Sequence, residues 1–277
     1  MRQSFVAEIM KLRRRPALWV LLALWFTLAL AFGYLIPYAV YSNPPTGISD
    51  VQQTQLLASV IPSGWLGNVV GGIPLFGAAM MVVATALVVG SEYGWSTMAT
   101  VMTQRPGRLQ VLGGKLGALV VVVVAFEAVV FAPGALASSI ITRAVGGPVD
   151  WPQAAEVLKV LGAGFLIFAV WAAVGTLLAV GLRSTSLPIG LGLVWLLVIE
   201  GLIAGFAGSL DILATVRGGL PGANGGALAA AFLPADFPDT PGVSSFTSAG
   251  HAVVVLVVWG VGSVVVASLL LRRRDVA

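Results

Sequence analysis

The sequence predicts an all-α integral membrane protein with six transmembrane helices, and three observations lead to this fold class. The chain of 277 residues is 58% hydrophobic and only 9% charged, whereas a soluble globular domain is usually about 25% charged. Its mean hydropathy of +0.99 implies more apolar surface than one core can bury, so the surplus must face lipid. Lys and Arg residues also gather between the apolar runs on one predicted side, as cytoplasmic loops do in membrane proteins.

The first 16 residues predict an N-terminal amphipathic interfacial helix. Phe5, Ile9 and Leu12 lie at i, i+4 and i+7, which places them on one helix face, and the charged residues lie elsewhere. A simple juxtamembrane anchor is the alternative for this pattern. The apolar run that starts at Ala17 has about 25 residues, longer than the core of a signal peptide, so we expect it to remain as a span.

Six apolar runs are long enough to cross a bilayer, which requires about 20 mostly apolar residues. They cover roughly 17–41, 71–91, 112–138, 157–181, 187–208 and 251–271. No internal repeat and no soluble domain accompanies them. We therefore expect residues 1–277 to form a single transmembrane domain.

The distribution of basic residues predicts the orientation of these spans. With the N-terminus inside, 12 of the 15 Lys and Arg residues lie on the inner side, and only Arg143, Lys159 and Arg217 lie outside. This bias predicts a multi-pass protein of the plasma membrane with both termini cytoplasmic. The net charge of +4 then reflects topology and the lipid bilayer as partner, and we expect no nucleic acid to bind.

The outer segment, residues 209–250, is too long and too rich in Gly and Pro to be an ordinary loop. It contains the run GALAAAFLP, which is apolar but too short to cross a bilayer. We expect partial order, with a re-entrant or interfacial helix before the last span. The alternative is a disordered Gly-rich loop.

Two carboxylates are predicted to lie inside spans, Glu127 in the third and Glu200 in the fifth. A charge at mid-bilayer costs about 2.5–3.5 kcal/mol on insertion scales, so neither side chain should face lipid. We expect each to contribute either an intramembrane polar path, including a proton-binding site, or helix packing. In the second case, a protonated carboxyl would bond to a backbone carbonyl or a hydroxyl.

Signatures of catalysis and of metal binding are missing from the sequence. The chain has no Cys and one His, which disfavours haem, zinc and disulfides. It contains no HExxH or GxSxG motif, and Leu109 occupies the position where a phosphate-binding loop ending at Lys115 needs its first glycine. We expect no catalytic residue, no metal, no cofactor and no enzymatic activity in the chain by itself.

Residues 91–111, between the second and third predicted spans, gather charged residues between two uncharged runs. This stretch resembles the cytoplasmic coupling segment of type-2 ATP-binding-cassette (ABC) exporter permeases, in which an acidic and aromatic start is followed by a basic turn and a Lys that opens the next span. Trp95 and Ser96 depart from that pattern. The matching residues are Glu92, Tyr93, Thr97, Arg105, Pro106, Arg108 and Lys115.

The resemblance implies a function that composition alone does not give. It implies that these seven residues bind a separate ATP-binding subunit, that a second permease subunit completes a homodimer or heterodimer, and that ATP hydrolysis in the separate subunit drives transport. The alternative is a self-contained secondary transporter, or an immunity or scaffold protein, in which residues 91–111 only set the topology.

Overall fold

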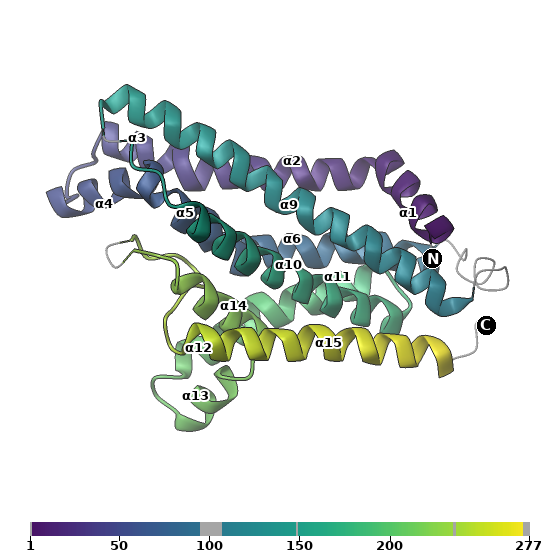
Figure 1. Cartoon of the computed structure of the whole chain (residues 1–277). Helices are drawn as coiled ribbons and strands as arrows, with labels where there is room; N and C mark the ends of the chain where they lie inside the picture. Colours follow the sequence, from purple (N-terminus) through teal and green to yellow (C-terminus); the bar gives the residue numbers. More distant parts are fainter. Residues whose placement is uncertain (1, 95–106, 148, 235–236, 274–277) are drawn as a thin grey trace.

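The structure is a computed structural model that describes residues 2–94, 107–147, 149–234 and 237–273, and these residues form helices and loops without a strand (Figure 1). Six helical units are long and apolar enough to cross a membrane, which confirms the predicted fold class. The units are Pro16–Ser42, Pro62–Tyr93, Arg108–Val145, Ala154–Leu182, Ser186–Phe206 and Ala249–Arg273.

Helix α1 (Arg2–Arg14) precedes the first span and ends where Pro16 opens the next helix. Pro is favoured at the first helical position, because its missing N–H would have no intrahelical partner there. The first span combines α2 (Pro16–Leu30), the π-helical turn η1 (Ala31–Leu35) and α3 (Ile36–Ser42).

The second span begins earlier than the sequence predicts, at Pro62 instead of residue 71, because Gly71 and Gly72 do not end the helical path. It is preceded by α4 (Asp50–Val60), which starts with a capping box between Ser49 and Gln52. Its parts are η2 (Pro62–Gly64), α5 (Trp65–Gly71), η3 (Ile73–Gly77), α6 (Ala78–Thr85), η4 (Ala86–Gly90) and α7 (Ser91–Gly94). Of these, η3 and η4 are π-helical.

The third and fourth spans are long helices, α9 (Arg108–Val145) and α10 (Ala154–Leu182). Helix α9 ends at Gly146, whose φ of 66° is the left-handed conformation that glycine adopts at helix ends. The fifth span combines α11 (Ser186–Leu193), the π-helical turn η5 (Val194–Ile199) and α12 (Glu200–Phe206).

Two short helices occupy the outer segment before the last span. Helix α13 (Asp211–Arg217) has no buried residue, whereas most residues of α14 (Pro221–Ala230) are buried against the bundle. The last span is α15 (Ala249–Arg273). The segment is thus helical in part, and its re-entrant placement in a membrane stays a prediction.

Helix α10 lies at the centre of the bundle, where it packs against α6, α9, α11 and α15. Its Trp171 and Phe168 are fully buried, and Phe168 makes edge-to-face contacts with Trp25 of α2 and Phe126 of α9. In the most apolar stretch of the second and fourth spans, 61% of the residues are buried inside the protein. In the first, fifth and sixth spans, only 11–17% of these residues are buried. These three outer spans therefore present wide apolar faces for lipid or another subunit.

Candidate functional site

Four charged side chains meet at the end of the bundle that carries both termini (Figure 1). We call this group the charge cluster. Glu8 and Lys11 come from α1, Glu92 from α7 at the end of the second span, and Lys115 from the start of α9. The cluster therefore joins the N-terminal helix to the two helices that flank residues 95–107.

The two lysines bridge the two glutamates in the charge cluster. The Lys11 ammonium lies 2.9 Å from Glu8 Oε1 and 2.6 Å from Glu92 Oε1. The Lys115 ammonium lies 3.2 Å from Glu8 Oε1 and 2.9 Å from Glu92 Oε1. Each ammonium thus contacts both carboxylates, and the four formal charges sum to zero.

The charge cluster is buried, so the equal number of positive and negative charges in it is important for stability. Lys115 is 1% exposed and Glu92 is 2% exposed, and Glu8 is also buried. Only Lys11 reaches the surface, with 37% of its side chain exposed. Removal of one partner from a buried ion pair costs about 3–5 kcal/mol, because an uncompensated charge remains inside.

A glycine allows α1 to approach α9 closely enough for the charge cluster to form. A Cβ atom on Gly114 would lie 2.7 Å from Cβ of Ser4 and 2.9 Å from its backbone carbon, which is closer than real contacts allow. One turn farther along α9, Phe5 of α1 lies against Gly117. Gly114, next to Lys115, therefore serves helix packing at this point.

The surroundings of Lys11 favour its charged form. Burial opposes that form, but hydrogen bonds to Glu8 and Glu92 outweigh burial and raise the pKa of Lys11 above its ordinary value. The neighbouring Arg15 donates a hydrogen bond of 2.6 Å to the carbonyl of Leu87 in η4. The junction of α1 and α2 is thus attached to the second span at two points.

The predicted subunit-binding residues fall into three groups. Glu92 and Lys115 belong to the charge cluster and are buried. Tyr93 is half-buried against the core, and the half-buried Arg108 donates a hydrogen bond of 3.4 Å to the carbonyl of Leu271 in α15. Thr97, Arg105 and Pro106 lie outside the described residues.

The sequence-based prediction missed Glu8 and Lys11 as members of a site. They lie three residues apart on α1, so their side chains are neighbours on one helix face and form an ion pair. That spacing was the available signal. Their contacts with Glu92 and Lys115 depend on the packing of α1 against the second and third spans, which no local pattern shows.

Glu200 occupies a second polar centre, at the start of α12. Its Oε1 accepts hydrogen bonds from the Trp195 indole N–H at 2.9 Å and the backbone N–H of Gly222 at 3.1 Å. Its Oε2 accepts one from the N–H of Ala223 at 2.8 Å. The carboxylate therefore binds the N-terminus of α14, where backbone N–H groups lack intrahelical partners. All three bonds run from N–H donors, so none requires a carboxyl proton.

Glu127 lies apart from Glu200, on the face of α9 that meets α10. It is buried, and a Cβ atom on Gly164 of α10 would lie 2.9 Å from its Oε1. The two intramembrane carboxylates thus face different helices, Glu127 towards α10 and Glu200 towards α14. Within the described ranges, no three His, Cys, Asp or Glu side chains group so that they could hold a metal ion.

Comparison with known proteins identifies the family of this arrangement. The family model for ABC-2 family transporter proteins matches residues 4–199. This range is well over half of the chain and contains all four residues of the charge cluster. No curated protein matches the chain. The six helical units that are long and apolar enough to cross a membrane fit a transporter of this family. The matched range also includes residues 91–111, where the sequence resembles ABC exporter permeases. The chain belongs to the ABC-2 family of transporter proteins.

Proposed function

We propose that the chain is the membrane-spanning permease subunit of an ATP-driven ABC exporter. In this proposal, two permease subunits form the translocation path above separate ATP-binding subunits, in the plasma membrane, with both termini cytoplasmic. Family membership and six apolar helices support the membrane part of the proposal. The excess of Lys and Arg in the segments on the side of the two termini supports the orientation.

The proposed coupling role is supported by the charge cluster. The coupling segment, residues 91–111, begins in α7, which carries Glu92, and ends within α9, four residues before Lys115. Because these two side chains contact each other and α1, a displacement of the segment would move the second span, the third span and α1 together. We assign Glu92 and Lys115 as positioning residues that fix the segment.

Direct contact with the ATP-binding subunit then falls to the matched residues that are not members of the charge cluster. These are Tyr93, Thr97, Arg105, Pro106 and Arg108. Arginines at such a surface would pair with carboxylates of the partner and fix its docking register. Closure of the ATP-binding subunits would pull on the segments and open a path between the two permeases.

The test compares a pair of basic residues of the coupling segment with a pair near the end of α9 and the start of α10. The Arg105→Gln/Arg108→Gln variant is expected to reach the membrane in normal amount but to copurify with several-fold less ATP-binding subunit from the native host. The control, Arg143→Gln/Lys159→Gln, also removes two positive charges and should copurify normally. ATP hydrolysis by the copurified material provides a second readout.

Two results would contradict the proposal. If the wild-type chain brings down no ATP-hydrolysing protein, a self-contained secondary transporter or an immunity or scaffold protein becomes the better assignment. If the chain alone hydrolyses ATP, the assignment of hydrolysis to a separate subunit is wrong. Equal copurification of both double variants would instead remove the coupling role from Arg105 and Arg108.

A further inference from the structure

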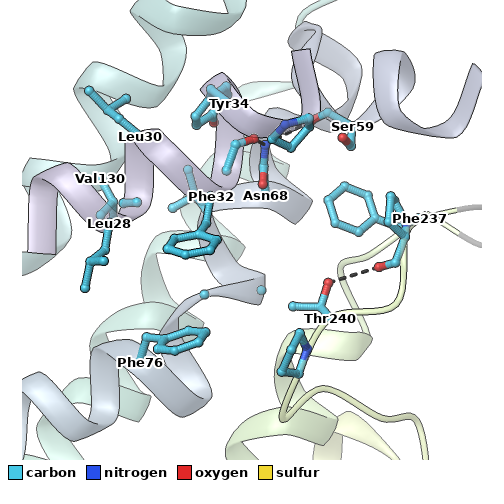
Figure 2. Close-up of a pocket in the computed structure, with 18 of the residues that line it drawn as sticks. Leu28, Leu30, Phe32, Tyr34, Ser59, Asn68, Phe76, Val130, Phe237 and Thr240 are labelled. Carbon is cyan, nitrogen blue, oxygen red and sulfur yellow. Dashed lines mark hydrogen bonds between the residues drawn. The ribbon is translucent and has the colours of Figure 1, made fainter. Parts of the chain in front are cut away.

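A cavity of about 350 Å³ lies between the first span, the second span and residues 237–241, at the end of the bundle remote from the termini (Figure 2). Phe32 and Phe76 line one part of it, and Asn68, Ser59 and Thr240 line another. We call this cavity the far-end pocket. It lies apart from the charge cluster and is not used by the proposed coupling.

The far-end pocket exists because both neighbouring spans depart from α-helical geometry beside it. Residues of η1 and η3 line it, and both turns are π-helical. Such turns occur frequently at functional sites, because the extra residue re-aims side chains and frees a backbone carbonyl. Here the Asn68 carboxamide N–H binds the carbonyl of Gly33 in η1 and, at 3.3 Å, the carbonyl of Ser59.

The apolar part of the far-end pocket is suited to an aliphatic chain. The rings of Phe32 and Phe76 stack with centroids 6.5 Å apart, and these side chains are 64% and 46% exposed on the faces of the spans. A cavity of about 150 Å³ holds benzene, so 350 Å³ has room for roughly a dozen carbon atoms. This corresponds to one chain of moderate length and excludes the two tails of a phospholipid.

In the polar part of the far-end pocket, the side-chain donors of Ser59, Asn68 and Thr240 are used within the protein. The Ser59 hydroxyl donates to the carbonyl of Leu56 at 2.8 Å, and the Thr240 hydroxyl donates to the carbonyl of Pro238 at 3.0 Å (Figure 2). Both carboxamide N–H groups of Asn68 face carbonyls, as described above. These three side chains leave the Asn68 carbonyl oxygen and the two hydroxyl lone-pair sets for a ligand.

One formal charge accompanies these acceptors. Asp239 is exposed at the rim, and none of the described residues that line the pocket is Lys or Arg. The Asp239 carboxylate and these acceptor oxygens favour a head group that donates hydrogen bonds and carries a positive charge. An anionic head group would meet the Asp239 carboxylate, with no Lys or Arg among the described lining residues to compensate the repulsion.

We propose that the far-end pocket binds a single-chain cationic amphiphile of the alkylammonium class. Its chain lies against the Phe32–Phe76 stack, and its ammonium donates hydrogen bonds to the Asn68 carbonyl oxygen and to Asp239. The site is a property of this chain alone, so it goes beyond the proposed ATP-driven transport and does not depend on it.

The test exploits the absence of cysteine from the sequence. A Pro241→Cys variant places a thiol at the rim of the pocket, and Ser245→Cys places one in the same outer segment but outside the pocket lining. Both are reconstituted in phosphatidylcholine nanodiscs, and the rate of maleimide labelling is measured with dodecylamine, dodecyl sulfate or dodecanol. Dodecylamine at neutral pH should slow labelling at position 241 by roughly tenfold near saturation and leave position 245 unchanged.

Two further substitutions separate the head-group and chain contributions. In the Pro241→Cys background, Asp239→Asn should weaken protection by dodecylamine several-fold and leave any protection by dodecanol unchanged. Ala29→Phe, which fills the apolar part, should abolish protection by both. Protection by dodecyl sulfate equal to that by dodecylamine, equal protection at positions 241 and 245, or no protection by dodecylamine would each overturn the proposal. None of these outcomes bears on the copurification of an ATP-binding subunit.

Discussion

Glu92 and Glu200 are both buried carboxylates in an apolar bundle, but the protein balances them in different ways. Glu92 contacts two ammonium groups, one from α1 and one from α9. Glu200 contacts no cation within the described part of the chain, and accepts three N–H hydrogen bonds, two of them from the start of α14. Full charges bind α1, the end of the second span and α9 together near the two termini, whereas partial charges bind the short helix α14 to Glu200.

The difference separates two mechanical roles. Full charges in a low-dielectric site give strong interactions, but each becomes costly when its partner is removed. A single hydrogen bond from a helix N-terminus to a carboxylate is a weaker contact, worth about 1.5–3 kcal/mol. We therefore expect α1, the end of the second span and the start of α9 to move as one body. We expect α14 to detach from Glu200 more easily. The predictions below test this comparison, from the largest expected effect to the smallest.

Replacement of Lys115 by Met should cause the largest loss of stability. Lys115→Met leaves Glu8 and Glu92 with Lys11 as their remaining cation in the cluster, so an uncompensated charge stays buried. We expect a loss of about 3–5 kcal/mol in the free energy of unfolding, measured by denaturant unfolding in detergent.

Two variants make the Lys115 experiment specific. Lys159→Met removes an exposed lysine at the start of α10 and should change stability little. Lys115→Met/Glu92→Gln restores neutrality and should recover a large part of the loss. If Lys115→Met proves as stable as Lys159→Met, the charge cluster does not hold the three helices together.

Replacement of Glu200 should loosen α14 and leave the termini end intact. Glu200→Leu removes three hydrogen bonds and leaves the N–H groups of Gly222 and Ala223 without their acceptor, at about 1–3 kcal/mol for each group that stays buried. Glu200→Gln keeps an acceptor oxygen and should be milder. Hydrogen–deuterium exchange should accelerate in Pro221–Ala230 and stay unchanged in α1. Faster exchange in both regions would show that the two centres are coupled.

A methyl group at Gly114 should separate α1 from α9. In Gly114→Ala, the new Cβ atom would lie 2.7 Å from Ser4 Cβ and 2.9 Å from backbone, so α1 has to shift as a whole. We expect a loss of about 1–3 kcal/mol, as for other overpacked sites, read from the same unfolding measurement. Gly162→Ala is the matched control, because it also lies within a helix but has no atom within 4 Å of the added Cβ. Equal stability of the two variants would contradict the close contact.

The sequence allowed the six spans to be predicted because hydropathy is a local property that lipid imposes on every residue of a span. It did not reveal the π-helical turns η1, η3, η4 and η5, since their residues are as apolar as their neighbours. The sequence placed the start of the second span at residue 71 because two consecutive glycines are typical of a helix end. In the structure, Gly71 and Gly72 keep helical backbone angles and the span continues through them.

The charge cluster was predicted only in part, because its members lie far apart along the chain. Glu92 and Lys115 attracted attention because they interrupt apolar runs. Their contacts with Glu8 and Lys11 join α1 to residues more than eighty positions away, and charge patterns within one segment cannot show such a pairing. The acceptor role of Glu200 depends equally on where α14 folds back.

The smallest expected effect concerns Lys11, the exposed member of the charge cluster. Its ordinary pKa is 10.5, and its hydrogen bonds to Glu8 and Glu92 raise the pKa in the folded protein despite the opposing effect of burial. Below the unfolded pKa, both states hold the proton, so the contribution of Lys11 to stability is fully present at neutral pH. As pH rises through the higher folded pKa, the ammonium loses its proton and the contribution is lost.

The measurement for Lys11 compares melting temperature against pH in wild type and Lys11→Arg. Arginine keeps its charge throughout, so the variant should lose less stability than wild type above about pH 10.5. The two curves should run parallel between neutral pH and about pH 10, because both side chains are then charged. Because solvent screens the exposed part of Lys11, we expect a modest divergence, far smaller than the effect of Lys115→Met. Divergence already at neutral pH would show that Lys11 acts through the shape of its side chain and not through its charge.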